Sequence, residues 1–401
     1  MLSLTTQLRR GRTVAVCAAL GLSAAVAGCG SSSSPSSSTA AASPAAATSG
    51  TSNSSAPSGV TYAEAQVGKY SKLLTSFSPP GPPLSGIKAK LSGRTVWYIP
   101  VFLQAPLFTA DAKDIAQPLA LAGATVHVCD AGSNPTQATS CLNEAVKSNA
   151  AAIVTDAMND SFASSAYAAA IAAKIPVVAT DNDDSAGFPK SPLLTTVSLG
   201  PPEDARLAAD WIIANSNGKA DVVYAADNSN DGVIEAAATK DEFTKYCPGC
   251  KYTAVSFGDL TVQNLATSIS SAMDKDPNIN YVDGGYDAPS GIYALQGAKT
   301  VTGRHFTYIT STGQPPGLQR LAAGQQAADP GLDPDDSMWN TADALFRILT
   351  GAKPVASYTP ALRIFTKSSV PSDVNDANAY ASGQWYTNGS FKAMYQKLWG
   401  L

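Results

Sequence analysis

Histidine is scarce in this chain, with only His127 and His305 among 401 residues. The sequence also lacks a GxxxxGKS or GxxxxGKT phosphate loop, a GxGxxG stretch after a strand, a GxSxG elbow and an HExxH pair. These absences remove the usual machinery of nucleotide binding, serine hydrolysis and zinc proteolysis. His127 lies in an apolar run and is expected to pack in a core, and His305 is expected at a surface turn. We therefore expect no enzyme, no cofactor and no metal.

The apolar run near the amino terminus, residues 13–27, is too short to span a bilayer and remain there. It follows Arg9, Arg10 and Arg12, and this basic-then-apolar order is typical of a secretory signal. The run ends in Val26-Ala27-Gly28-Cys29, which resembles a bacterial lipobox. Residues 1–28 are then a signal peptide and Cys29 carries the lipid. An ordinary signal, cut after a small residue, is the alternative.

Residues 29–58 are almost wholly Ser, Ala, Thr, Pro and Gly after the cysteine. Such a segment cannot bury enough apolar surface to offset its ordering entropy, so we expect a disordered tether. Removal of residues 1–28 takes away three of the 27 basic residues and none of the 31 acidic ones, which leaves 24 against 31, a net charge of −7. A mildly acidic surface argues against nucleic acid or anionic lipid as partner.

Of the six cysteines, four remain once Cys17 leaves with the signal and Cys29 is lipidated. Cys129 and Cys141 flank a loop of Gly, Ser, Asn and Pro, and Cys247 and Cys250 enclose Pro-Gly. Outside the cytoplasm these pairs predict two local disulfides. A redox role for the CxxC pair is the alternative, but the pair follows a helix pattern, and a helix start is where the dipole lowers a thiol pKa.

The body of the chain alternates short apolar strands with helices in two series. Residues 59–93 are expected to form an accessory helix and a Pro-rich lead-in. The first series has expected strands at residues 95–101, 124–129, 150–155, 175–180 and 193–198, and the second at 221–226, 252–257, 281–284 and 306–310, followed by a last strand at 361–365. A helix at 335–349 and an amphipathic terminal helix complete the pattern. The fold class is therefore α/β, with two doubly wound parallel-sheet lobes.

Polar or aromatic residues follow strand after strand. Carboxylates and amides hydrogen-bond hydroxyls, and aromatic faces cover sugar rings. Because ligands gather at the carboxyl ends of parallel strands, we expect these side chains to share one cleft. Asp and Asn are also favoured at strand ends and helix caps, so each of them could be a cap instead, and Phe108 could belong to the core. The candidates from this pattern are Gln104, Leu107, Phe108, Asp156, Asp181, Asn182, Asp227, Asn228, Tyr286 and Asp287.

Over residues 94–366 the chain resembles the type I periplasmic binding proteins, in the ribose-binding group of ABC importer receptors. VWYIPVFLQAPLF resembles the family's first strand and the aromatic pair that follows it. The resemblance implies that Leu107 and Phe108 stand at stacking positions, Asp156 at an amide position and Asp181-Asn182 at an Asp-Arg pair. It places Tyr286-Asp287 at an Asn-Asp element of the second lobe, and Thr312 near a position where the family has another aspartate.

Three departures separate the chain from that pattern: Leu107 replaces an aromatic residue, Asn182 replaces an arginine, and residues 232–243 contain no arginine. They leave the scaffold intact and argue against ribose as the ligand.

The resemblance also implies a three-segment hinge near Leu199, Leu332 and Leu362. One lobe would contain residues 94–199 and 333–362, and the other 200–332 and 363–401. A sugar-like ligand would bind between closing lobes of a monomer and be presented to an ABC permease. A sensor that presents its ligand to a signalling partner and a secreted hydrolase are the alternatives.

Overall fold

A computed structural model describes residues 58–182, 187–198, 202–353, 355, 357–358 and 360–401. These residues belong to one compact unit that spans 54–401. The signal peptide, Cys29 and nearly all of the expected tether lie outside the described residues. Within the described residues, no helix is long and apolar enough to cross a membrane.

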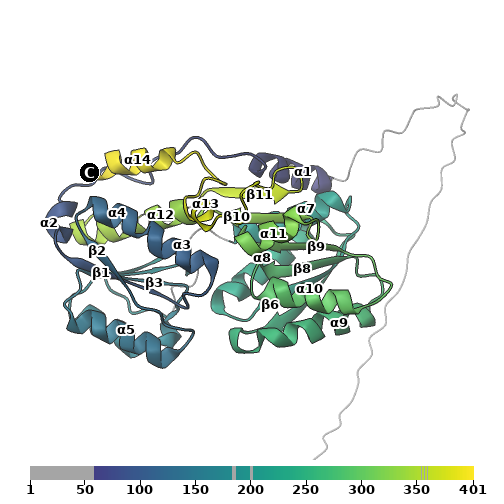
Figure 1. Cartoon of the computed structure of the whole chain (residues 1–401), viewed down its shortest axis with the longest axis horizontal. Coiled ribbons are helices and arrows are strands. Elements are labelled where there is room, and N and C mark those ends of the chain that lie inside the picture. Colours follow the sequence, from purple (N-terminus) through teal and green to yellow (C-terminus); the bar gives the residue numbers. More distant parts are fainter. Residues whose placement is uncertain (1–57, 183–186, 199–201, 354, 356, 359) are drawn as a thin grey trace, which may run out of the picture. The chain divides into compact units, whose positions relative to one another are not determined.

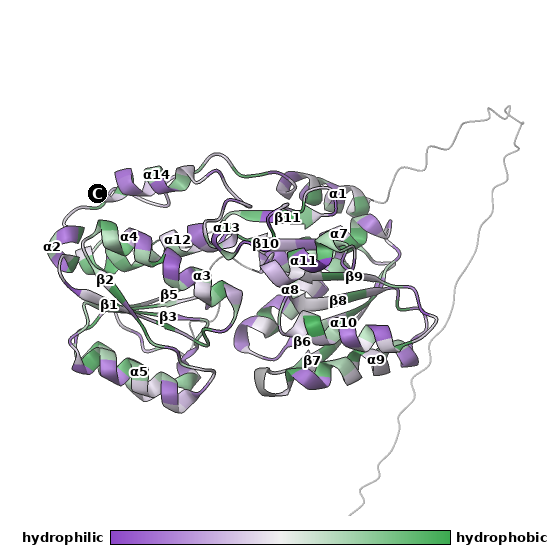
Figure 2. Cartoon of the chain, viewed as in Figure 1, coloured by the Kyte–Doolittle hydropathy of each residue, from purple (hydrophilic) through white to green (hydrophobic). Residues whose placement is uncertain are grey.

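The first lobe is built on a five-stranded parallel sheet in the order β2-β1-β3-β4-β5. The strands are β1 (Thr95–Pro100), β2 (Thr125–Val128), β3 (Ala152–Asp156), β4 (Val177–Thr180) and β5 (Leu194–Val197). Val96 and Tyr98 point into one core, and Trp97 and Ile99 into the other, because side chains alternate along a strand. Central strands of this sheet therefore contribute to a hydrophobic core on each face. Figure 2 shows green, hydrophobic stretches in the strands and in the helices that cover them.

Helices cover both faces of this sheet (Figure 1). One face carries α3 (Pro106–Asp114), α4 (Ala116–Leu121) and α12 (Pro334–Thr350), with α2 (Ile87–Leu91) beside them. The other carries α5 (Pro135–Lys147) and α6 (Ser164–Ala172), which follows the short 3-10 turn η1 (Asp160–Phe162). α12 comes from much later in the chain, so this lobe is assembled from discontinuous segments.

The second lobe has a parallel sheet in the order β7-β6-β8-β9. Its strands are β6 (Asp221–Asp227), β7 (Lys251–Phe257), β8 (Tyr281–Tyr286) and β9 (Thr307–Ser311). Residues of α7 (Glu203–Asn215) and α8 (Asn230–Tyr246) form one core, and those of α9 (Leu265–Lys275) and α10 (Ser290–Thr300) form the other. η2 (Asp259–Asn264) precedes α9, and α11 (Pro315–Ala322) follows β9. Two parallel sheets with helices on both faces confirm the predicted fold class.

β10 (Ala328–Leu332) and β11 (Leu362–Thr366) form a separate two-stranded antiparallel sheet. Along the chain, β10 lies between α11 and α12, and β11 lies between α12 and the terminal segment. The sequence analysis did not predict β10, since Pro330 and Gly331 are residues that strands disfavour. Leu332 pairs with Leu362, so two of the three expected hinge segments lie side by side.

The terminal segments depart from the expected division. α1 (Ser58–Tyr70) packs on α7 of the second lobe, and Tyr62 stacks on Tyr246 with ring centroids 3.7 Å apart. α14 (Ser390–Trp399) belongs to the core of the first lobe, although residues 363–401 were assigned to the second. The apolar face of α14 packs in this core, where the ring of Trp399 stacks on Trp339 of α12.

The two terminal segments also pair with each other. Leu74 forms a parallel bridge with Thr387, and its amide donates to the Tyr386 carbonyl at 2.9 Å. α13 (Ala377–Ala381) lies just before this bridge, in a cluster that joins Ala110 of α3 to Leu318 of α11. The chain therefore connects the lobes at the two terminal segments as well as at the β10–β11 pair.

His127 is exposed, which contradicts its expected place in a core. β2 is an edge strand whose residues are mostly exposed, so its alternation does not bury both faces. The imidazole lies instead against the ring of Trp97, 4.0 Å between centroids. His305 is exposed, as expected.

Candidate ligand-binding site

A cavity of about 230 Å³ is lined by residues of both lobes. Its walls come from the carboxyl ends of the strands: Val101 follows β1, Ala157 follows β3, Asp227 ends β6 and Phe257 ends β7. Loops that leave parallel strands diverge there and leave room for a ligand. The cavity is therefore the candidate binding site.

Six of the eleven predicted site residues line this cavity: Leu107, Phe108, Asp181, Asp227, Tyr286 and Thr312. Leu107 and Phe108 stand in the first turn of α3, and Tyr286 is the last residue of β8. The fold therefore brings Leu107 and Tyr286, 179 positions apart in sequence, to one site.

The other five predicted residues lie outside the lining. The Gln104 amide donates to Asp130 Oδ2 at 3.1 Å, and the buried Asn182 amide donates to the Thr180 carbonyl at 2.7 Å. Asn228 is exposed beside Gly258. Asp156 and Asp287 are buried behind the cavity wall, where each holds other side chains.

Asp156 is buried in the first lobe and is hydrogen-bonded there. Its Oδ2 accepts a 2.6 Å hydrogen bond from the Tyr98 hydroxyl. Burial raises the pKa of Asp156 to about 7, although the bonds from Tyr98 and from the Ala157 amide act in the opposite direction. Burial, together with repulsion from Asp156 and Asp114, also holds the pKa of the lining residue Asp111 well above its ordinary value.

Asp287 organises the corresponding region of the second lobe. Its carboxylate accepts hydrogen bonds from the main-chain amide of Gln314 at 2.6 Å and from the hydroxyl of Thr310, and lies 3.4 Å from the Arg320 guanidinium. The α-carbon of Gly317 packs directly on this carboxylate. A Cβ at this position would therefore stand only 1.8 Å from Asp287 Oδ1. Asp287 therefore positions Thr312 and Gln314, which do line the cavity.

Several lining residues were not predicted. Among them are Phe102, two residues before the predicted Gln104, Asp111 in α3, and Asp231 and Glu235 in α8. Asp111 stands four residues after Leu107, and Glu235 four residues after Asp231, so each pair shares one helix face. The four-residue spacing from the predicted Leu107 is the signal that could have found Asp111. Phe162, Asp204, Ser229 and Gln314 carried no such signal.

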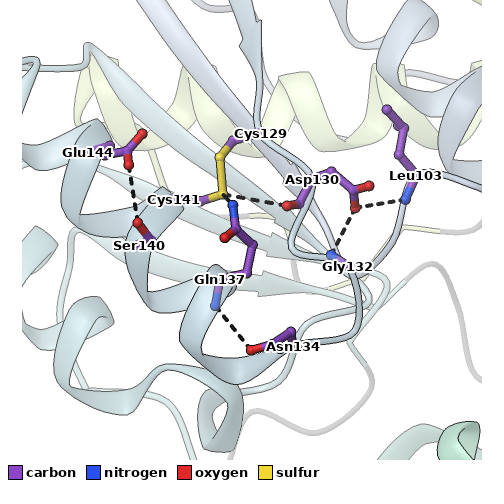
Figure 3. The surroundings of a disulfide bond; sticks show 9 residues. All are labelled: Leu103, Cys129, Asp130, Gly132, Asn134, Gln137, Ser140, Cys141 and Glu144. Atoms are coloured by element: carbon purple, nitrogen blue, oxygen red, sulfur yellow. Dashed lines mark hydrogen bonds between the residues drawn. A yellow bond between two sulfur atoms is a disulfide. The ribbon is translucent and has the colours of Figure 1, made fainter.

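Both predicted cysteine pairs are bonded, Cys129 to Cys141 and Cys247 to Cys250. Figure 3 shows the first pair joining the residue after β2 to α5, next to Asp130. Asp130 Oδ1 accepts from the amides of Leu103 at 3.0 Å and Gly132 at 2.9 Å. The disulfide thus anchors the carboxylate that holds the loop between Phe102 and Leu107, which lines the cavity.

The sequence model of the periplasmic binding protein domain matches residues 96–353. The chain belongs to this family of two-lobed binding proteins, whose members act outside the cytoplasm. No curated protein matches the sequence.

Solved structures share the fold at low sequence identity. A Mycobacterium smegmatis protein in complex with β-D-fucofuranose is 16% identical, with 72% of this chain and 97% of that chain covered and a TM-score of 0.57. A Caulobacter myo-inositol binding protein bound to myo-inositol is 17% identical, with 71% and 97% covered and a TM-score of 0.60. An ABC transporter solute binding protein from Agrobacterium vitis with bound allitol is 20% identical, with 70% and 97% covered and a TM-score of 0.58.

Proposed function

We propose that the protein is a solute receptor without catalytic activity, which captures a small sugar-like molecule between its lobes and presents it to an ABC importer. The observation that carries the proposal is the cavity itself, because its lining comes from both lobes and a ligand there contacts both. A ligand that binds both lobes stabilises the closed arrangement by its differential affinity. The permease then distinguishes closed from open receptor.

The solved structures support a polyhydroxylated ligand, since their own ligands are a fucofuranose, an inositol and an allitol. The lining offers matching groups: carboxylates and amides for hydroxyls, and the rings of Phe102 and Phe108, 5.3 Å apart and edge-on, for apolar ring faces. Of the eleven site residues that the sequence predicts, we propose as ligand contacts the six that line the cavity.

Location follows from the amino-terminal sequence. We propose that Cys29 carries a lipid, that residues 29–58 tether the folded body, and that the protein is a monomer on the outer face of the plasma membrane. Metabolic labelling with a radioactive fatty acid tests the anchor. Label should appear in the wild-type chain and be absent from a Cys29→Ser variant.

The receptor function is tested by calorimetric titration of the full chain, in nonionic detergent, with sugars, inositols and alditols. We expect one of them to bind with micromolar affinity or better. Circular dichroism of the same sample establishes that the chain is folded. A folded chain that binds none of these solutes would refute the proposed function.

A further inference from the structure

The cavity wall is acidic. Six carboxyl groups line it, and the described lining residues include no lysine, arginine or histidine. We propose that the ligand is an organic cation, a protonated amine carried on a sugar or polyol frame. This inference rests on the proposed function and narrows its ligand class. The six carboxyl groups are those of Asp111, Asp181, Asp204, Asp227, Asp231 and Glu235.

Arg320 and Arg206 pair with carboxylates outside the lining. Arg320 lies 3.4 Å from Asp287, and Arg206 lies 3.7 Å from Glu242.

Helix starts offset only part of the carboxylate charge. α3, α7, α8, α10 and α12 all begin at or beside lining residues, and a helix start carries about half a positive charge. Five starts therefore offset about half of five carboxylates, if Asp111 is counted as neutral because burial raises its pKa. A neutral sugar would leave the remaining negative charge in a partly desolvated cavity, whereas a cation would neutralise it.

The hydrogen-bonding groups of the wall point to the same ligand. The Ser229 hydroxyl donates to the Asp227 carboxylate, and the Thr312 hydroxyl donates to the Asp287 carboxylate. The Ser337 hydroxyl donates to the Asp333 carbonyl. The side-chain amide of Gln314 donates to the Thr312 hydroxyl. These donors of the wall are therefore used within the protein.

An acceptor, in contrast, is left over. Gln314 Oε1 is buried at the cavity wall and has no hydrogen-bond partner among the described residues. Gln314 is 4% exposed, so its side chain is almost fully buried. An ammonium group brings three donors and no acceptor, which suits the six carboxyl groups and this amide oxygen of the wall.

A metal ion suits the wall less well than an organic cation does. Within the described part of the chain, no three carboxylate, imidazole or thiol groups stand close enough together to hold a metal. The carboxyl groups are instead distributed around a space that Phe102, Phe108, Phe162, Phe257 and Tyr286 also line. Aromatic rings attract organic ammonium groups through their faces.

Matched pairs of solutes test the inference. The full chain, in nonionic detergent at pH 7 and low salt, is titrated calorimetrically with glucosamine and glucose, with galactosamine and galactose, and with the neutral N-acetyl derivative of each amine. We expect each amine that binds to do so at least tenfold more tightly than its neutral partners. Sodium chloride at about 0.5 M should reduce this advantage, because salt screens the attraction.

Variants on α8 locate the charge effect. Glu235→Gln and Asp231→Asn should each weaken binding of the amine about tenfold, which corresponds to about 1.4 kcal/mol, and weaken binding of the neutral partner by clearly less, since only the amine loses a charge interaction. Asp241→Asn is the matched control, since Asp241 is exposed on the same helix and about 15 Å along the axis from Asp231. It should change neither affinity.

The outcomes separate the inference from the proposed function. If neutral sugars bind as tightly as the amines or more tightly, the charge inference is overturned and the receptor function stands. Choline and spermidine are titrated in addition, as cations without a sugar frame. If one of them binds and no sugar or amino sugar does, the positive charge of the ligand stands, and the sugar or polyol frame and the sugar-like ligand class are overturned. If a folded chain binds nothing in the panel, both are overturned.

Discussion

The Tyr98 hydroxyl donates a 2.6 Å hydrogen bond to Asp156 Oδ2 between the neighbouring strands β1 and β3, and both side chains are buried. The Tyr98→Phe variant leaves the carboxylate without this donor. We expect the free energy of unfolding to fall by about 1–3 kcal/mol at pH 8, where Asp156 is ionised, and by less at pH 5. Urea denaturation at both pH values measures this, and equal losses would show that the bond does not respond to the charge of Asp156.

Stability should decrease as pH rises from 5 to 8. Burial raises the pKa of Asp156, Asp283 and Asp336 to about 7 from an ordinary value of 3.8. These groups hold protons more tightly in the folded chain, so their contribution is complete below about pH 4 and is lost as pH passes about 7. The urea midpoint should therefore be higher at pH 5 than at pH 8. Asp283→Asn should flatten the dependence, and a midpoint that increases with pH would contradict the expectation.

Asp181 and Asn182 are adjacent but should have different roles. Asp181 lines the cavity, and Asp181→Asn should weaken ligand binding about tenfold with little loss of stability, since asparagine tolerates its positive φ of 53°. Asn182→Ala removes a buried donor to the Thr180 carbonyl and should lower the free energy of unfolding by about 1 kcal/mol. Titration and urea denaturation of both variants compare the roles, and the reverse pattern would exchange them.

Trp399 should be a major determinant of first-lobe stability. Its ring stacks on Trp339, with centroids 5.3 Å apart, and its Nε1 donates to Asp343 Oδ1 at 2.8 Å. Trp399→Ala should lower the free energy of unfolding by about 3–5 kcal/mol, as large-to-small changes in a core do. Lys397→Ala, at an exposed position of the same helix, is the control. Equal effects of the two variants would refute the docking of α14.

The two disulfides should differ in their contribution to stability. Cys129–Cys141 closes a loop with a sequence separation of 12, and Cys247–Cys250 one with a separation of 3. Loop-closure entropy gives about 3 kcal/mol for the first and about 2 for the second. Paired Cys→Ala variants, compared by urea denaturation, should follow that order. Cys129→Ala with Cys141→Ala should also weaken ligand binding, because Asp130 holds the 103–107 loop.

Much of the site was predictable from local position. Asp181, Asp227 and Tyr286 end strands, and parallel strands bring their carboxyl ends to one edge. The same rule also selected Asn182 and Asp287, whose side chains turn to backbone groups and to Arg320. Strand-end position does not show which way a side chain turns, since that depends on partners distant in sequence.

The alternation of apolar runs with helical patterns determined the two-lobed α/β fold, because strand and helix periodicity are local properties of the chain. The cysteine spacings likewise determined the two disulfides. The tertiary structure alone decided that α14 completes the first lobe, that β10 pairs with β11, and that helix residues such as Asp111 and Glu235 face the cavity. These are contacts between distant segments, and packing across the molecule selects them.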